Sequence, residues 1–198
     1  NSYQQSDLVT AADTTAEHAQ ACAELIDKVG GVHNQGPFTP WRFRAEGAPP
    51  PVTLVFPGML GGPNWGGTAH DRRSGYLFVT TQDVGALGWV EKGREGSPLP
   101  YQRVAPEGRA TFEVRMGGVN WPCQKPPWGR LIAVNTSTGD IAWQVPLGIT
   151  DGLPAEKQRT GRPMLAGPIV TASGVLFIAS TDDNRFRALD ATTGAELW

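Results

Sequence analysis

The residues best suited to chemistry lie in one glycine-rich stretch, residues 57–67, where an asparagine is followed directly by a tryptophan. It reads Pro-Gly-Met-Leu-Gly-Gly-Pro-Asn-Trp-Gly-Gly, with five glycines in its last ten residues. Because glycine has no Cβ, the backbone here can approach a ligand closely. Asn64 offers amide donors and an acceptor, and Trp65 offers a flat face. The stretch is a candidate binding loop, and the alternative is a glycine-rich turn with one buried tryptophan.

Phosphate binding is not indicated for this stretch, because it has neither the dinucleotide-binding glycine spacing nor a Gly-Lys-Ser/Thr ending. The two cysteines, Cys22 and Cys123, lie in no metal or haem motif. His18 and Cys22 are four residues apart and could ligate a metal, but no second pair accompanies them and packing is favoured. In an exported protein the cysteines would form a disulfide, and in a cytosolic protein they would be two packed thiols.

A repeated phrase predicts the elements that position these residues. Residues 133–143 and 188–198 share a pattern of alanine, asparagine or aspartate, Thr-Gly and a final tryptophan, with an offset of 55 residues at each matched position. The asparagine or aspartate favours a turn, and the glycine permits positive φ. We therefore expect two hairpins, each of which offers an indole, Trp143 or Trp198, to a neighbouring sheet.

Further predicted strands precede each copy, at residues 75–81 and 174–180. Gly75 and Gly174 are 99 residues apart rather than 55, which indicates an insertion of 44 residues in the first unit, at roughly residues 82–129. Each unit then has four strands, as in a blade of a β-propeller. The predicted fold class is all-β, a partial propeller with the first blade at about 52–146 and the second at about 163–198.

Residues 1–51 are predicted to form a short helix and a surface loop. Residues 13–17 carry a helix start signal and Gly30-Gly31 a stop signal, whereas residues 52–56 are predicted to form a buried strand. The join at residues 148–163, which includes Arg162, is predicted to be a solvated loop. Two blades cannot close a ring, so we expect the chain to be part of a longer protein.

Composition excludes some classes of partner. The chain has 17 basic and 19 acidic residues, a balance that does not suggest binding to nucleic acid or to an anionic membrane surface. No apolar run reaches membrane-spanning length. The high content of glycine (25) and proline (17) is typical of many short strands joined by turns.

Taken together, these motifs resemble the quinoprotein dehydrogenases, eight-bladed propellers that bind pyrroloquinoline quinone (PQQ), whose tryptophan-docking motifs look like the repeated phrase. The resemblance runs from about residue 16 to the end of the chain. Several stretches are similar to the membrane-type glucose dehydrogenase branch in particular. The stretches that carry it are 54–58, 64–67, 122–129, 163–168 and 175–179. Both cysteine positions have counterparts in that branch, so the resemblance favours the disulfide.

The resemblance implies oxidation of a sugar or alcohol hydroxyl with PQQ and Ca²⁺, with electrons passing to a membrane quinone or a cytochrome. Asn64 is the first implied cofactor contact and Trp65 beside it the second. Leu165 is the third, at a position where relatives carry a tryptophan that lines the cofactor's edge. The family's catalytic aspartate, Ca²⁺ ligands and cofactor-binding lysine belong to earlier blades, so no catalytic residue or metal ligand is expected in this C-terminal fragment.

The resemblance further implies a periplasmic protein, possible membrane association through a preceding region, and a fragment that is inactive without the remaining blades. Two other classes stay open. One is a non-enzymatic propeller scaffold like the outer-membrane assembly lipoproteins, which lack the Gly-Gly-x-Asn-Trp loop and the proline-cysteine insertion. The other is a binding module of the exported envelope that uses the insertion for recognition.

Overall fold

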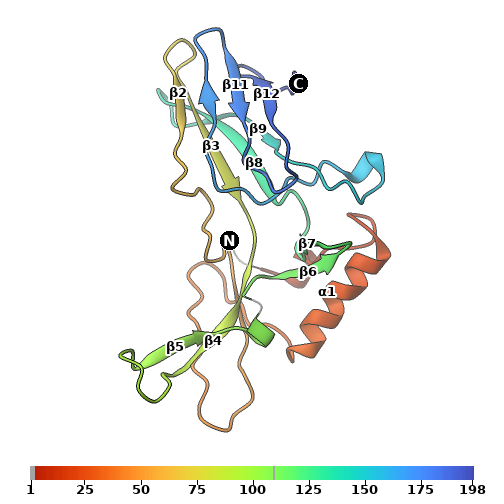
Figure 1. The fold of residues 1–198 in the computed structure, drawn as a ribbon, viewed down its shortest axis with the longest axis vertical. Helices are drawn as coiled ribbons and strands as arrows, with labels where there is room; N and C mark the ends of the chain where they lie inside the picture. Colours follow the sequence, from red (N-terminus) through yellow and green to blue (C-terminus); the bar gives the residue numbers. More distant parts are fainter. Residues whose placement is uncertain (1–2, 109) are drawn as a thin grey trace. The chain divides into compact units, whose positions relative to one another are not determined.

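The computed structural model describes residues 3–108 and 110–198, which form two compact units (Figure 1). The first comprises the chain up to Met59 together with Val84–Lys125, and the second comprises Leu60–Asp83 together with Pro126–Trp198. Antiparallel strands dominate both, and the described residues contain one α-helix, α1 (Ala16–Lys28). The all-β fold class with a short N-terminal helix is confirmed.

The first unit is built around α1 and two small sheets. One sheet has the order β1 (Thr53–Val55), β4 (Ala86–Lys92), β5 (Tyr101–Val104), and the other pairs β6 (Glu113–Met116) with β7 (Val119–Pro122). Helix α1 begins where the side chain of Thr15 accepts a hydrogen bond from the backbone N–H of His18 at 3.1 Å, as an N-cap residue does. Buried apolar side chains from both sheets and the helix form the core of this unit, with Cys22, Leu54, Leu87 and Phe112 among them.

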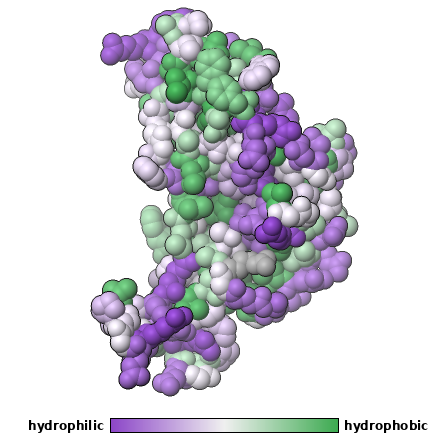
Figure 2. All heavy atoms as spheres, in the orientation of Figure 1, coloured by the Kyte–Doolittle hydropathy of each residue, from purple (hydrophilic) through white to green (hydrophobic). Residues whose placement is uncertain are grey.

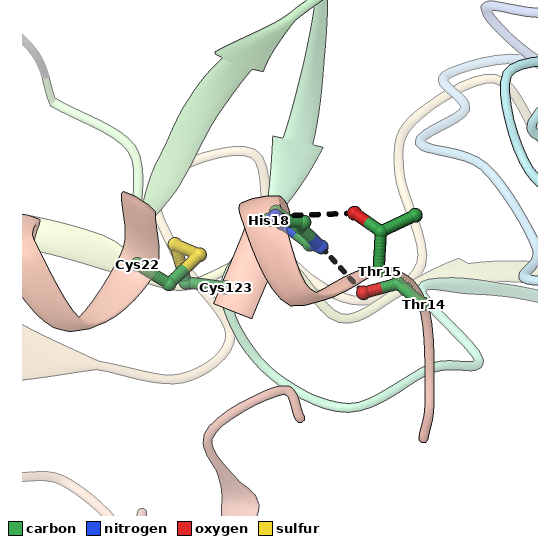
Figure 3. The surroundings of a disulfide bond; sticks show 5 residues. All are labelled: Thr14, Thr15, His18, Cys22 and Cys123. Atoms are coloured by element: carbon green, nitrogen blue, oxygen red, sulfur yellow. Dashed lines mark hydrogen bonds between the residues drawn. A yellow bond between two sulfur atoms is a disulfide. The ribbon is translucent and has the colours of Figure 1, made fainter. Parts of the chain in front are cut away.

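A disulfide between Cys22 and Cys123 fixes α1 to the segment after β7 (Figure 3), with the two Cα atoms 5.4 Å apart. The disulfide is therefore confirmed. His18 and both cysteines lie together and are fully buried. Disulfide sulfurs are not the thiolates that bind metals, so His18 packs rather than ligates. Its Nδ1 is 2.8 Å from the Thr14 hydroxyl, and its ring meets Trp121 edge to face at 5.2 Å.

Two sheets form the second unit. The first has the order β2 (Ala69–Asp71), β3 (Tyr76–Gln82), β8 (Gly129–Asn135), β9 (Ile141–Pro146). The second has the order β10 (Ile169–Val170), β11 (Val175–Ile178), β12 (Arg187–Asp190), and a bridge from Leu189 to Glu196 begins a fourth strand. Side chains from both sheets fill one shared core, which contains Phe78, Leu131, Ala133, Leu176, Ile178 and Leu189.

The two repeated phrases meet between these sheets. The indole of Trp143 donates its N–H to the carbonyl of Ala191 at 3.2 Å, and a Cβ on Gly194 would lie 2.8 Å from the ring. Gly194 has a φ of 74°, so both its turn and its contact with the indole favour glycine. Trp198 differs, because its side chain is 75% exposed and its ring contact is to Phe186, at 6.2 Å.

Hydrophobic side chains remain on the surface of the second unit (Figure 2), and the larger exposed ones include Leu165, Ile169, Phe186, Leu197 and Trp198. Among the residues that the structure describes, no helix combines the length and the hydropathy needed to cross a membrane.

The units divide the chain differently from the boundary expected near residue 52. The expected buried strand is present as β1, but it pairs with β4 in the first unit rather than joining the four-stranded sheet. Strand β3 ends at Gln82 and β8 begins at Gly129, so residues 83–128 leave and rejoin one sheet between adjacent strands. Hydrophobic burial explains the difference, since β1 and the excursion share the core that contains Cys22 and Cys123.

Candidate functional site

Asn64 organises its own loop. Its Nδ2 donates to the carbonyl of Leu60 at 2.9 Å, and its Oδ1 accepts from the backbone N–H of Trp65 at 2.8 Å. These two bonds fix the orientation of the amide and close the loop. Trp65 is 96% exposed, so the alternative of a turn around a buried tryptophan is wrong. The loop presents an aromatic face that the described residues do not cover.

The turn that carries Leu165 lies directly beside this loop. Gly66 and Ala166 form a parallel bridge, and the N–H of Gly167 donates to the carbonyl of Gly66 at 3.2 Å. A Cβ on Gly66 would lie 2.6 Å from the Cα of Ala166 and closer still to the carbonyl oxygen of Leu165. Glycine is required here for close approach. Leu165 is 51% exposed. The loop of Asn64 and Trp65 and the turn of Leu165 are thus brought together.

Hydroxyl groups hold the turn from the sheet side. The Thr80 hydroxyl donates to the carbonyl of Ala166 at 3.1 Å. The Ser180 hydroxyl accepts from the Ala166 N–H at 2.8 Å and donates to its carbonyl at 2.9 Å. These residues use both polar groups of the Ala166 backbone and thereby fix the turn in place.

Gln82 connects the two segments. Its backbone N–H donates to the carbonyl of Gly62 at 3.0 Å. Its side-chain Nε2 donates to the carbonyl of Leu60 at 3.4 Å, and its Oε1 accepts from the N–H of Met164 at 3.3 Å. Sequence reasoning missed this residue. The signal was present, because Gln82 follows Phe78 by four residues in one strand and therefore lies on the same, buried face.

Arg162 lies at the base of the turn and is also buried. Its guanidinium makes two hydrogen bonds to the carboxylate of Asp182, at 2.6 and 2.7 Å, and lies 5.7 Å from the ring centroid of Trp128. The expectation of a solvated loop across residues 148–163 is therefore wrong at Arg162, whose side chain is 2% exposed. A paired and stacked guanidinium can be buried, because its charge and its donors are satisfied.

A second ion pair, in which both side chains are buried, stabilises the segment before β12. Asp183 accepts hydrogen bonds from the Arg187 guanidinium, from the Thr181 hydroxyl and from the backbone N–H of Ile149. Burial alone would raise the pKa of Asp183, but these hydrogen bonds outweigh it and lower the pKa to about 2. This carboxylate stays ionised and has a structural role.

The class of protein follows from this geometry. Two antiparallel sheets face each other across a shared core, an indole from one packs on a turn of the other, and glycine-rich segments meet at Gly66 and Ala166. These features define a partial β-propeller.

Comparison with known proteins then identifies the family. Residues 1–198 match the family described as "PQQ: Glucose/ethanol/alcohol dehydrogenase, beta-propeller domain". The chain therefore belongs to the PQQ-dependent dehydrogenase β-propeller family, and the predicted resemblance is confirmed.

Individual relatives agree with this assignment. The chain is 35% identical over 170 residues to the quinate/shikimate dehydrogenase (quinone) of Acinetobacter baylyi, a match that covers 74% of this chain and 21% of the relative. It is 30% identical over 167 residues to the quinoprotein glucose dehydrogenase of Escherichia coli, again covering 74% of this chain and 21% of the relative. The chain thus spans about a fifth of the length of these relatives.

The fold also has a counterpart among solved structures. A europium-containing methanol dehydrogenase matches with a TM-score of 0.50 and 21% sequence identity, over 79% of this chain and 23% of that one. At this level of identity the likeness concerns the fold alone.

Proposed function

We propose that this chain supplies one wall of the PQQ site of a quinoprotein dehydrogenase, with Asn64, Trp65 and Leu165 as cofactor contacts. The observation that carries the proposal is the bridge between Gly66 and Ala166, which brings the loop of Asn64 and Trp65 beside the turn of Leu165. Two segments a hundred residues apart in sequence are held together, while Trp65 and Leu165 stay open to a ligand.

The groups at these positions fit a planar, oxygen-rich cofactor. An asparagine amide has two N–H donors, and Leu60 uses one of those of Asn64, so a second is available for a quinone or carboxylate oxygen. The exposed indole of Trp65 offers a flat apolar face against which a planar ring system can stack. Leu165 would contribute apolar contact but no aromatic stacking.

Bound PQQ would supply the electron-accepting carbonyl groups for oxidation of a hydroxyl. Within this chain Asn64 would bind and orient the cofactor, and its N–H would stabilise negative charge on the oxygen that it contacts. The glycine-rich backbone would allow that approach, and Leu165 would exclude water from the cofactor's edge. The catalytic aspartate, the Ca²⁺ ligands and a cofactor-binding lysine would come from other parts of the protein, so the chain by itself would be inactive.

For the whole protein, we propose oxidation of a sugar or another alcohol, with electrons passing to a quinone or a cytochrome. Relatives are named as quinate, glucose and glycerol dehydrogenases, which points to hydroxyl groups on polyols and rings. We also propose that the Trp143 contact with Ala191 and Gly194 is a tryptophan-docking interaction, and that further blades complete the ring.

A periplasmic location is proposed on the basis of the disulfide, because such bonds persist in oxidising compartments. The measurement is mass analysis of the natural protein without reduction. Two free thiols would contradict this part of the proposal.

The test of the function uses the full-length protein with PQQ and Ca²⁺ and follows dye-linked oxidation of quinate, glucose, glycerol and ethanol. We expect turnover with at least one of these, and Asn64→Ala should weaken PQQ binding about tenfold, as expected for loss of a hydrogen bond to a charged or strongly polar group. Absence of turnover with every substrate would favour the alternative, a non-enzymatic scaffold or binding module.

A further inference from the structure

Gln82 is a buried residue that contacts both segments of the proposed cofactor site. It is the last residue of β3 and is 3% exposed, and its carboxamide lies between two main-chain groups. Its nitrogen donates to the carbonyl of Leu60 and its oxygen accepts from the N–H of Met164. Each end of the amide therefore meets a partner of the opposite hydrogen-bonding type.

Both partners lead directly to residues of the proposed site. The carbonyl of Leu60 also accepts the N–H of Asn64 at 2.9 Å, so Gln82 and Asn64 share one oxygen atom. Met164 immediately precedes Leu165. The backbone N–H of Gln82 adds a further bond to Gly62, in the same loop as Asn64. One side chain thus contacts both the loop and the turn.

We propose that Gln82 is a positioning residue for PQQ, which sets the Asn64 amide and the Leu165 turn at a fixed separation. The inference rests on the proposed function, because it assumes that these two segments bind the cofactor. Gln82 acts through the Leu60 carbonyl and the Met164 N–H and does not touch the cofactor itself.

The polarity of the amide provides the test. In Gln82→Glu the carboxylate still accepts from the Met164 N–H, but it cannot donate to Leu60, and two oxygens then face each other. Protonation of the carboxyl group restores a donor of nearly the same shape. Burial raises the pKa of such a group, which brings this protonation within reach of mildly acidic solution.

The experiment measures the Kd of PQQ for the full-length protein, with Ca²⁺, at pH 5 and pH 8. Relative to wild type at the same pH, Gln82→Glu should bind about tenfold more weakly at pH 8 and about twofold more weakly at pH 5, as expected for loss and return of one hydrogen bond. Because each variant is compared with wild type at the same pH, any effect of PQQ titration on the Kd cancels. Gln82→Leu should bind about tenfold more weakly at both pH values, because it has no group to protonate.

A matched control is Gln144→Glu, the same chemical change at an exposed position of β9 in the same sheet. Its Kd should equal that of wild type at both pH values. Far-UV circular dichroism checks that each variant folds. If Gln82→Glu fails to fold, Gln82→Leu is combined with Asn64→Ala. The two residues share the Leu60 carbonyl, so part of their effects should not add, whereas the contact of Gln82 with Met164 does not involve Asn64. The double variant should therefore bind more weakly than Asn64→Ala alone, but by less than the product of the two single losses.

The outcomes separate the two proposals. If wild type does not bind PQQ, the proposed function is wrong. If wild type binds PQQ but Gln82→Glu loses the same affinity at both pH values, or Gln82 and Asn64 substitutions have additive effects, then Gln82 is a structural residue and the inference is overturned.

Discussion

Replacement of Gly66 by alanine tests the contact that forms the proposed site. Gly66 does not have a positive φ, so alanine can adopt its backbone conformation and the effect is purely steric. The added Cβ would lie 2.6 Å from the Cα of Ala166, where nine in ten real Cβ contacts exceed 3.4 Å. The loop and the turn must therefore separate by about 1 Å, which is the scale of misplacement that lowers catalysis strongly.

Two costs follow from that separation. Overpacking in a tight contact typically costs about 1–3 kcal/mol. The 3.2 Å hydrogen bond from Gly167 to Gly66 would lengthen beyond a useful distance, at a cost of about 1 kcal/mol. We expect Gly66→Ala to lower the free energy of unfolding by about 2–4 kcal/mol, and to lower kcat/KM of the reconstituted full-length protein about 100-fold.

Gly62 provides the control within the same loop. A Cβ there would have only the carbonyl oxygen of Gln82 nearby, at 4.0 Å, and φ is again not positive. Gly62→Ala should be neutral or stabilising by up to about 1 kcal/mol, because alanine restricts the unfolded chain. Urea unfolding and steady-state kinetics measure both variants. Equal stability and equal activity of Gly66→Ala and Gly62→Ala would refute the close approach between loop and turn.

Three further predictions concern stability. Replacing Cys22 and Cys123 by serine removes a cross-link that spans 101 residues and should cost about 2–5 kcal/mol in urea unfolding, whereas an unchanged midpoint would contradict the disulfide. Burial lowers the pKa of His18 to about 4, whereas the pKa of a histidine in the unfolded chain is about 6.5. As the pH falls, the unfolded chain therefore binds a proton first, and the free energy of unfolding at pH 4 should be about 3 kcal/mol below its value above pH 6.5. A His18→Gln variant should lack that part of the decline. Asp183→Asn leaves the buried Arg187 cation with only the more distant and partly exposed carboxylate of Glu196, at 3.5 Å, and should cost up to about 3–5 kcal/mol, and a loss below about 1 kcal/mol would show that the Asp183 pair is dispensable.

Local sequence patterns predicted much of the fold, because caps, turns and hairpins are determined by residues that are neighbours in the sequence. A few adjacent positions determine the cap at Thr15, the glycine turns and the repeated Thr-Gly-x-x-x-Trp phrases. The helix and the hairpins are found at the residues where these patterns occur. The repeat added a long-range element, since its register indicated that Trp143 would face the neighbouring sheet.

The rest depends on contacts that no local pattern encodes. The approach of Gly66 to Ala166 and the bridge made by Gln82 join segments far apart in sequence. Arg162 was predicted to be solvated because its neighbours are polar, yet Asp182 and Trp128 satisfy its charge in the interior. Division of the chain into units was also missed, because strand β1 can pair either within a blade or outside it, and the pairing depends on the core around the disulfide.

The connection between β3 and β8 has a consequence for how such proteins diversify. Gln82 and Gly129 are paired partners in adjacent strands, and the N–H of Asp83 donates one more hydrogen bond to the carbonyl of Trp128 at 2.8 Å. The segment between Asp83 and Trp128 therefore leaves and re-enters the sheet at directly opposed positions. To the sheet, those dozens of residues are equivalent to a hairpin turn. Insertions can therefore accumulate there over evolution while the four strands of this sheet keep their register.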